Sequence, residues 1–287
     1  MNPVKIAVAP ALLMVSCAAH ALDSSPGDYA WLGDNAKVAV LYAQYQHART
    51  FSADGAGEVP NSEFESALGI FRSVYYKSFG DMRMSFQFFV PFGGFPTAKV
   101  GGVNQPTAEG LGDLTLGSTF YPFASAEPTG TTLGLSLFVT TPTGNHDSSK
   151  VSMGGGGWAV TPQIGLIQGL GNNFYLNAIV DVAWRESVSD GGMKDSSEPA
   201  TQVQTYLTYK FTPGTSFSVG YSGRFGGERS LGDVYTGTKT RNDQLRLFAD
   251  TFVSPTLQVQ GMIGHDIYAE GGFKSDAVIQ VRLARLF

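Results

Sequence analysis

The final stretch, Asp276-Ala-Val-Ile-Gln-Val-Arg-Leu-Ala-Arg-Leu-Phe287, decides the predicted fold. Apolar side chains occupy every second position from Ala277 to Leu283, and the positions between them are mixed in polarity. This period of two is typical of a β-strand whose two faces meet different surroundings. Taken alone, the strand fits the edge of a soluble β-sandwich or the closing strand of a membrane β-barrel, which leaves no unpaired edge.

The terminal aromatic residue favours the second interpretation. A strand that stops at Phe287 with no polar tail resembles the C-terminal strand of bacterial outer-membrane barrels. That resemblance implies that the barrel-assembly machinery is a partner and reads Phe287. Arg285 departs from the pattern because it places a charge on the apolar face, but it lies near the strand end, where its long stem can carry the guanidinium to the interface.

The composition predicts an all-β protein. Only 15% of the 287 residues are charged, against roughly a quarter in an average soluble protein, and 12% are aromatic. Beyond the N-terminus, no stretch approaches the ~20 continuous apolar residues of a membrane helix. The apolar residues are instead spread over many short segments, as in a barrel.

Residues 1–21 have the layout of a signal peptide. Lys5 precedes the mostly apolar run Ile6–Cys17, and Ala19-His-Ala21 supplies small residues at the cleavage positions. Cleavage after Ala21 is therefore expected. A lipoprotein cysteine at Cys17 is the alternative, because Met14-Val-Ser-Cys17 weakly resembles a lipobox.

Removal of the signal peptide leaves a chain with no cysteine, since the sequence contains a single one. We therefore expect no disulfide, no thiol nucleophile and no thiolate metal site. Without Lys5 the chain has 18 basic and 24 acidic residues, a formal charge of −6. This balance argues against a nucleic-acid partner.

From residue 37 onward the sequence predicts a transmembrane, antiparallel, up-and-down β-barrel of about 12 strands. Each predicted strand has about ten residues, which suits a tilted strand that crosses a bilayer. In the segment 174–185, for example, Phe174, Leu176, Val180 and Trp184 alternate with polar positions. The predicted strands are 37–50, 64–78, 82–90, 111–122, 131–141, 158–168, 174–185, 201–211, 217–226, 240–252, 257–268 and 276–287.

Short and long connections alternate along this barrel domain, 37–287. The long ones are rich in Gly, Ser, Asp, Asn and Pro, and they fall at 51–63, 91–110, 142–157, 186–200, 227–239 and 269–275. This layout predicts the bacterial outer membrane as the location, with short turns in the periplasm and long loops outside. Residues 22–36 form either a periplasmic lead or a plug in the barrel.

Aromatic residues near the predicted strand ends suggest two girdles at the membrane interfaces. They are Tyr75, Tyr76, Phe79, Phe120, Tyr121, Phe123, Trp158, Phe174, Trp184, Phe211, Phe217 and Phe287.

The segment Gly110-Leu-Gly-Asp-Leu-Thr-Leu-Gly-Ser-Thr-Phe-Tyr-Pro-Phe123 resembles the outer-membrane channel family known for the meta-pathway of phenol degradation. Further matches are Asp28-Tyr29, Val90-Pro-Phe-Gly93, Thr141-Pro-Thr-Gly144, and Gly165 to Gly171 before the strand that carries Trp184. The resemblance covers the whole mature chain. It implies a single-chain barrel of about twelve strands that admits small, often hydrophobic or aromatic, compounds and that contains no catalytic residue.

Ten charged residues occupy inward positions of the predicted strands and are the candidate pore-lining residues. One interpretation is a polar constriction that binds or steers solutes, slightly favouring anions. The other is that these charges pair with each other, because an unpaired buried charge is costly. The ten are Arg83, Asp113, Asp181, Arg185, Lys210, Arg224, Arg246, Asp250, Asp266 and Arg282.

The sequence does not predict an enzyme, and it predicts no cofactor and no metal. His47, His146 and His265 lack the spacing of metal ligands, and no serine motif supports a lipase-type site. Nothing in the sequence brings Asp181 and Asp250 together as the acid pair of a barrel protease. The glycine run 154–157 is followed by neither Lys-Ser/Thr nor a helix, so it is not a phosphate-binding loop.

The sequence therefore predicts a monomeric, passive outer-membrane channel for uptake of small, hydrophobic or aromatic molecules. Its expected partners are outer-membrane lipid and the solutes themselves. About twelve strands should leave a narrow lumen that a loop or residues 22–36 can occlude. The alternative is a closed structural or surface-interaction barrel that acts through its extracellular loops.

Overall fold

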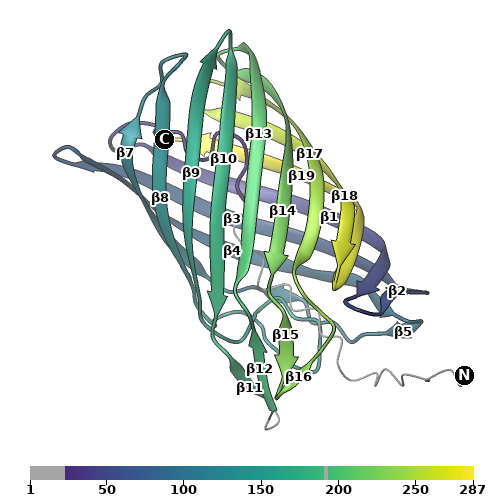
Figure 1. The fold of residues 1–287 in the computed structure, drawn as a ribbon. Helices are drawn as coiled ribbons and strands as arrows, with labels where there is room; N and C mark the ends of the chain where they lie inside the picture. The colour runs from purple at the N-terminus through teal and green to yellow at the C-terminus, as the bar shows by residue number, and fades with distance from the viewer. Residues whose placement is uncertain (1–22, 191–192) are drawn as a thin grey trace, which may run out of the picture.

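The computed structural model describes residues 23–190 and 193–287, and the predicted signal peptide lies outside this part of the chain. Twelve long strands form an antiparallel barrel (Figure 1). They are β1 (Lys37–Ala53), β3 (Glu63–Phe79), β4 (Met82–Val100), β7 (Thr115–Ala124), β8 (Thr131–Thr140), β9 (Ala159–Gly171), β10 (Phe174–Arg185), β13 (Ala200–Thr212), β14 (Thr215–Gly226), β17 (Arg241–Ser254), β18 (Leu257–Glu270) and β19 (Gly272–Leu286). The described residues include no helix of the length and hydropathy that crossing a membrane requires.

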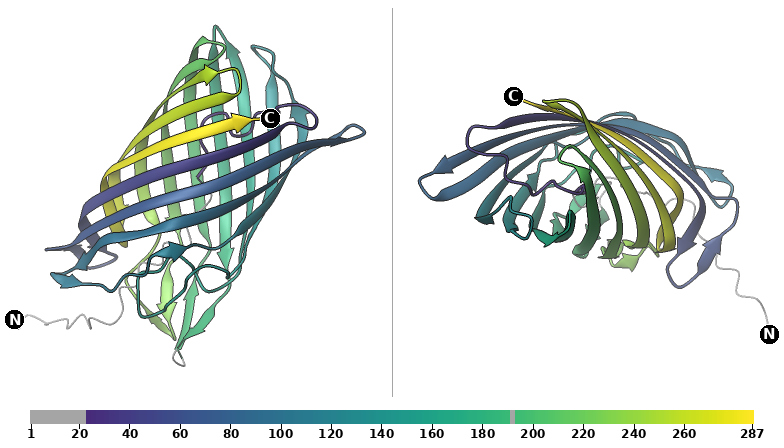
Figure 2. Two further views of the ribbon diagram at one scale, coloured as in Figure 1. Left: turned by 180° about the vertical axis from the view of Figure 1, so that it is seen from behind. Right: turned by 90° about the horizontal axis from the view of Figure 1, so that it is seen from above.

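Each long strand pairs with its neighbour in the sequence, and the last strand pairs with the first. The pairing of β1 with β19 runs from Val38 opposite Leu286 to Ser52 opposite Gly272, and Figure 2 shows the two strands side by side. Within the described residues, every long strand has a paired neighbour on both sides, so the ring is closed. The prediction of an all-β, up-and-down barrel of about twelve strands is confirmed.

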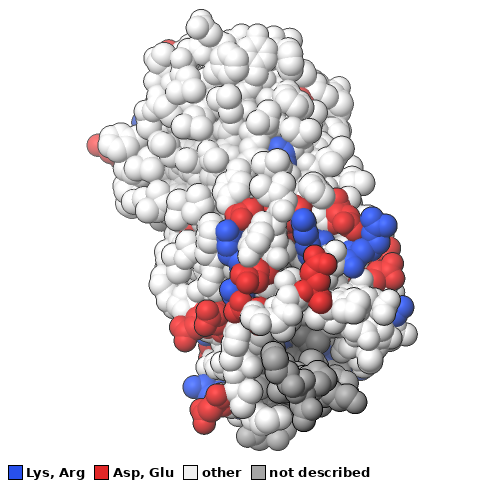
Figure 3. Space-filling view, turned by 45° about the vertical axis from the view of Figure 1, so that its right-hand side comes forward, with Lys and Arg blue, Asp and Glu red and all other residues white. Residues whose placement is uncertain are grey.

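The period-two pattern separates an apolar outer face from a largely polar interior. On β19, Ile279, Val281 and Leu283 are 49%, 46% and 41% exposed, whereas Gln280 and Ala284 are buried. Buried Ser, Thr, Asn and Gln side chains from other strands share this interior. In Figure 3 the upper part of the visible face is nearly free of charge, and Lys, Arg, Asp and Glu gather lower down. This arrangement is that of a barrel in a bilayer.

The barrel has two different ends. Short turns connect the strands at one end, where Phe287 N also donates to Lys37 O at 2.9 Å. At the other end the strands extend into short elements, and four of these form a separate sheet in the order β11-β12-β15-β16 (Figure 1). The short elements are β2 (Gly57–Val59), β5 (Val103–Asn104), β6 (Gly110–Leu111), β11 (Val188–Asp190), β12 (Met193–Ser197), β15 (Arg229–Leu231) and β16 (Val234–Tyr235).

The prediction of a loop over residues 91–110 is wrong, because β4 continues to Val100. Pro91, Gly93 and Gly94 interrupt the alternation that ends the predicted strand at residue 90. The backbone nevertheless stays paired with β3 as far as Lys99, which lies opposite Glu63. Pairing with β7, in contrast, covers only Arg83 to Phe89 of β4.

Candidate solute pathway and the N-terminal segment within it

Residues 23–36, which we call the N-terminal segment, lie inside the barrel. Near its beginning, Ser24 donates from its backbone N to Gln204 Oε1 at 3.3 Å and from Oγ to Gln163 Oε1 at 3.2 Å. Gly27 N donates to Asn177 Oδ1 at 3.0 Å. These acceptors lie on β13, β9 and β10, so the segment is bound to the interior of the barrel wall over several strands.

Near its end, the N-terminal segment joins the sheet before β1 begins. Asn35 N donates to Tyr76 O, and Tyr76 N donates to Ala36 O, both at 2.9 Å. The segment therefore starts within the lumen and leaves it at the end with the short turns.

Tyr29 anchors the middle of the N-terminal segment, and its aromatic ring packs against two glycines of the barrel wall. Gly134 on β8 is directly opposite Gly165 on β9. A Cβ atom at either position would approach the Tyr29 ring to within 2.4 Å or less. The Tyr29 hydroxyl bonds with Ser136 Oγ at 2.9 Å and donates to Gln163 Oε1 at 2.8 Å. The two glycines thus supply the space that the ring occupies.

Trp31 packs against two tyrosines of the inner wall. Its ring centroid is 5.5 Å from that of Tyr76 and 5.4 Å from that of Tyr121, in edge-to-face geometry. The assignment of Tyr76 and Tyr121 to the outer girdles is wrong, because both are buried inside the barrel. In the Tyr75-Tyr76 and Phe120-Tyr121 pairs, only one residue can face the lipid, and the period-two register decides which.

Asp28 is held between two arginines of the barrel wall. Asp28 Oδ2 is 3.0 Å from Arg72 Nη1, and Oδ1 is 3.1 Å from Arg282 Nη2. Arg72 points inward and also donates from Nε to Gln87 Oε1 at 3.0 Å. All three charged side chains are at most 11% exposed, so each depends on the others for compensation.

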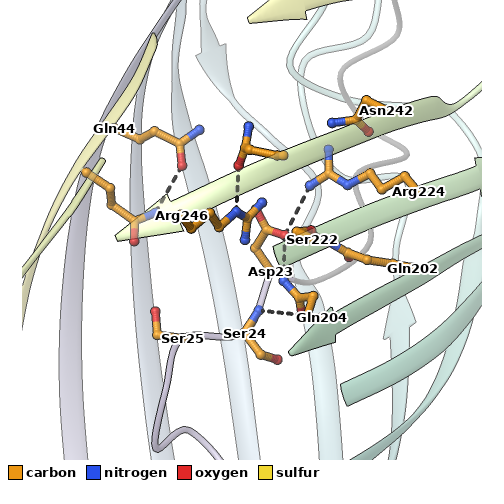
Figure 4. Close-up of polar contacts among 12 residues, drawn as sticks. Asp23, Ser24, Ser25, Gln44, Gln202, Gln204, Ser222, Arg224, Asn242 and Arg246 are labelled. Atoms are coloured by element: carbon orange, nitrogen blue, oxygen red, sulfur yellow. Dashed lines mark hydrogen bonds and ion pairs between the residues drawn. The ribbon is translucent and has the colours of Figure 1, made fainter. Parts of the chain in front are cut away.

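Asp23 forms a second ion-pair group with two other arginines (Figure 4). Asp23 Oδ1 is 3.1 Å from Arg224 Nη2, and Oδ2 is 3.1 Å from Arg246 Nη2. Gln202 and Gln204 donate to Oδ1 at 2.6 and 3.0 Å. Two carboxylates of the N-terminal segment thus engage four arginines on four different strands.

The loop between β8 and β9 also folds inward. Its residues Val151, Ser152 and Met153 are buried. The carboxylate of Asp113 accepts hydrogen bonds from Gly144 N at 2.8 Å and from Gly155 N at 2.6 Å, and so it binds both sides of the loop. This inward loop, residues 141–157, narrows the barrel near the end with the long loops.

The separate four-stranded sheet is tied to the barrel through Asp195. Arg229 donates to both carboxylate oxygens of Asp195, at 2.8 and 2.9 Å, and Arg185 Nη2 is 3.5 Å away. Burial alone would raise the pKa of Asp195, but the hydrogen bonds from Arg229 and the charges of both arginines outweigh it and lower the pKa. The carboxylate is therefore ionised at neutral pH.

Between these parts the structure contains a cavity of about 410 Å³. One part of its lining is apolar and includes Phe51, Phe64, Leu68, Phe89, Met153 and Phe273. Another part carries cationic side chains, namely Arg185, Arg224, Arg229, Lys239, Arg241 and Arg246. Asp23 and Ser24 belong to the lining, so the N-terminal segment forms part of the cavity wall.

The cavity brings together five of the ten charged residues that the sequence singles out: Asp113, Arg185, Arg224, Arg246 and Asp266. Asp113 lies before β7 rather than within a strand, because its loop contacts replace strand pairing. Asp266 accepts from Gln244 and from Ser275 N, both at 2.8 Å.

The other five residues lie outside the cavity lining. Arg83 is exposed at the start of β4, and Lys210 Nζ is 4.1 Å from the centroid of the Tyr175 ring. Asp181 accepts from Gln163 at 2.9 Å, Asp250 accepts from Ser216 and Gln258, and Arg282 binds Asp28. Asp181 and Asp250 thus have different partners. Pore lining stays a prediction for all ten residues.

Sequence reasoning misses Asp23, Asp28, Tyr29 and Arg72 as interior residues. A signal exists in Asp28-Tyr29, which lies in a segment with no strand pattern of its own. Arg72 offers another, because a charge that fits neither face of a strand needs a partner from elsewhere in the chain.

The rings of the three histidines in the described part of the chain lie beside carboxylates and backbone oxygens. His146 Nδ1 is 3.1 Å from Gly154 O, His265 Nδ1 is 2.8 Å from Asp276 O, and His47 lies near Glu63 and Asp276. None of these partners is a serine. No group of three or more His, Cys, Asp or Glu side chains within residues 23–190 and 193–287 is arranged to hold a metal ion.

The profile of a family described as "Putative MetA-pathway of phenol degradation" matches residues 29–283. The solved structure of the COG4313 outer membrane channel from Pseudomonas putida F1 is similar, with a TM-score of 0.87 and 25% identity over 92% of this chain and 100% of that one. No curated protein sequence matches.

More distant structures share the fold alone. The transport unit of the autotransporter AIDA-I from Escherichia coli has a TM-score of 0.56 and 9% identity, with 92% of each chain covered. The NanC porin has a TM-score of 0.50 and 8% identity, with 86% of this chain and 98% of that chain covered.

Proposed function

Since the chain belongs to the family described as "Putative MetA-pathway of phenol degradation", we propose that it is a passive channel of the bacterial outer membrane for small hydrophobic or aromatic molecules. The observation that carries this proposal is a closed barrel with an apolar exterior whose interior holds a cavity with both aromatic and cationic lining. A filled, purely structural barrel has no need of such a cavity. The similarity to the COG4313 outer membrane channel supports the same class of function.

The barrel sits in the membrane with its long-loop end outside and its short turns in the periplasm. A solute from outside reaches the cavity first and then meets the N-terminal segment. Asp23, Asp28 and Tyr29 hold this segment across the lumen, so passage toward the periplasm requires the segment to shift. The segment is therefore a plug, and the solute gradient supplies the driving force.

A further part of the proposal is that the barrel assembles and works as a monomer. Lipid surrounds its apolar outer face, and the assembly machinery recognises the exposed terminal ring of Phe287. A single chain suffices because the described strands close the ring without help from a second copy.

Planar-bilayer recording and proteoliposome flux test this function. The wild-type protein should pass toluene or phenol into liposomes faster than protein-free liposomes do. A variant with Asp23→Asn and Asp28→Asn should give larger or more frequent conductance steps, because both ion-pair groups that hold the plug are removed. Asp34→Asn is the matched control, since Asp34 lies at the exposed end of the segment beside Lys77.

The proposed channel function would be contradicted if neither the wild-type protein nor the Asp23→Asn, Asp28→Asn variant gave conductance steps or flux above background. That outcome would favour the alternative of a closed barrel that acts through its outer loops and the sheet β11-β12-β15-β16.

A further inference from the structure

We propose that the cavity binds small aromatic carboxylates, with the ring against its apolar wall and the carboxylate at the guanidinium of Arg224. This inference rests on the proposed function and narrows the class of solute.

The first support is the arrangement of the lining around the ring of strands. Arg224 lies on β14, and β4, which supplies Phe89, is directly across the twelve-stranded ring. Phe64 on β3 and Phe273 on β19 stack, with ring centroids 5.1 Å apart, and both line the cavity. An occupant therefore meets aromatic side chains on one side and a guanidinium on the other.

The second support is the state of the Arg224 guanidinium. It makes one hydrogen bond among the described residues, from Nη2 to Asp23 Oδ1 at 3.1 Å. Its buried Nε has no acceptor within the described part of the chain. A guanidinium has five N–H donors. The buried Nε cannot reach a solute, so the Nη1 group and one N–H of Nη2 remain for another acceptor.

Arg246, its neighbour in the same ion-pair group, is different. Its Nε donates to Gln244 Oε1 at 2.5 Å, Nη1 donates to Tyr206 OH at 3.3 Å, and Nη2 donates to Asp23 Oδ2 at 3.1 Å. Arg246 therefore holds the plug, whereas Arg224 can hold the plug and a solute together. Figure 4 shows both side chains beside Asp23.

The acidic residues of the lining do not oppose an incoming carboxylate strongly. Asp113, Asp266 and Asp23 accept hydrogen bonds from protein donors on both of their carboxylate oxygens. Glu270 is 3.0 Å from Lys239 Nζ, and Glu198 is exposed. Six basic and five acidic side chains line the cavity, whereas the whole chain has a net charge of −5. The lining is therefore more basic than the chain as a whole.

The two supports together select an aromatic carboxylate over simpler solutes. A neutral aromatic compound would fill the apolar side but leave the donors of Arg224 without an acceptor. An inorganic anion would satisfy Arg224 but leave the aromatic wall against water. A volume of about 410 Å³ is in the range of sites for small organic ligands, and planar carboxylates match the guanidinium fork.

Titration of the purified full-length protein in detergent tests the inference, with benzoate, its neutral isostere benzamide and acetate as probes. Calorimetry should show that benzoate binds at least about tenfold more tightly than either of the others. Arg224→Gln should abolish that preference and leave benzamide binding unchanged, and Arg224→Lys should retain part of it. Arg49→Gln, an exposed arginine on the outer face, is the matched control.

Heat-modifiable migration in gels shows whether each variant is folded. Equal affinity for benzoate and benzamide in the wild-type protein, or a preference that persists in folded Arg224→Gln, would overturn the inference. Proteoliposome flux of the same solutes separates it from the proposed function. Binding of benzoate without flux of any solute would contradict the proposed channel function but not the carboxylate site. Flux of toluene or phenol without benzoate binding would contradict the carboxylate site but not the channel function.

Discussion

Arg246 Nη2 lies 3.1 Å from Asp23 Oδ2, although 223 positions separate the two residues in the sequence. The contact joins the start of the N-terminal segment to the interior of β17. Together with the Arg72–Asp28 contact, it holds the N-terminal segment against β3 near the beginning of the chain and against β17 near its end.

Asp28→Asn should destabilise the barrel substantially. The substitution leaves Arg72 and Arg282 as buried guanidiniums without a carboxylate, and breaking a buried pair in this way costs about 3–5 kcal/mol. Urea unfolding in detergent, followed by tryptophan fluorescence, measures the change. Asp34→Asn removes only an exposed pair with Lys77 and should change the free energy of unfolding far less. Equal effects of the two substitutions would contradict the assigned role of Asp28.

Gly165→Ala and Tyr29→Ala should not be additive. The new methyl group in Gly165→Ala would overlap the Tyr29 ring, so this single variant should lose stability and release the plug. In a chain that already carries Tyr29→Ala, the same methyl group meets empty space and should cost far less. A double-mutant cycle from unfolding free energies should show a coupling of about 0.5–3 kcal/mol. If the effects of the two substitutions were additive, the Tyr29 ring would not lie against Gly165.

Tyr29→Phe isolates the hydroxyl of the same residue. It removes the bonds to Ser136 and Gln163 but keeps the ring over the two glycines. The loss should be about 1–3 kcal/mol, because buried partners are left unsatisfied. Bilayer recordings should show intermediate plug release, between the wild-type protein and Tyr29→Ala. A Tyr29→Phe variant as open as Tyr29→Ala would mean that the hydroxyl alone holds the segment.

Acid should loosen the outer four-stranded sheet through Asp195. The folded pKa of Asp195 is below its unfolded value, so its contribution to stability is complete above the unfolded pKa and is lost as the pH falls through the folded one. Protonation weakens the contacts with Arg229 and Arg185. Proteolysis of the long-loop end by pepsin, normalised at each pH to the rate on an unfolded substrate, should therefore become faster as the pH is lowered below about 4. Asp195→Asn should be cut readily across the whole acidic range, and a pH dependence that persists in this variant would assign the effect to another group.

Phe287→Ala should lower the amount of folded protein in the outer membrane without altering the stability of the barrel that does form. The backbone bond from residue 287 to Lys37 O does not need the side chain, and the ring is 73% exposed. Quantification of membrane fractions measures assembly, and urea unfolding measures stability. Phe79→Ala, at an exposed aromatic residue beside a short turn, is the matched control. Equal yields of the two variants would argue against recognition of Phe287 by the assembly machinery.

The sequence by itself determined the barrel and most of its register. Alternation with period two assigns each side chain to one of two faces, and a membrane offers lipid to only one of them. Phe174, Val180 and Trp184, for example, face outward as their spacing predicts. The assignment of Tyr76 and Tyr121 to the girdles failed because it used their position near strand ends and not the period-two register, and both residues are buried against Trp31.

Only the tertiary structure decided what fills the lumen. Asp23, Asp28 and Tyr29 lie in a segment without strand periodicity, and their partners come from strands up to 254 positions away in the case of Asp28 and Arg282. Such contacts depend on closure of the ring, which brings β19 beside β1 and places distant arginines around one interior. A local sequence pattern reflects the backbone period and the surroundings of each strand face. Charge compensation in the interior depends instead on residues that are far apart in the sequence and come together only in the folded barrel.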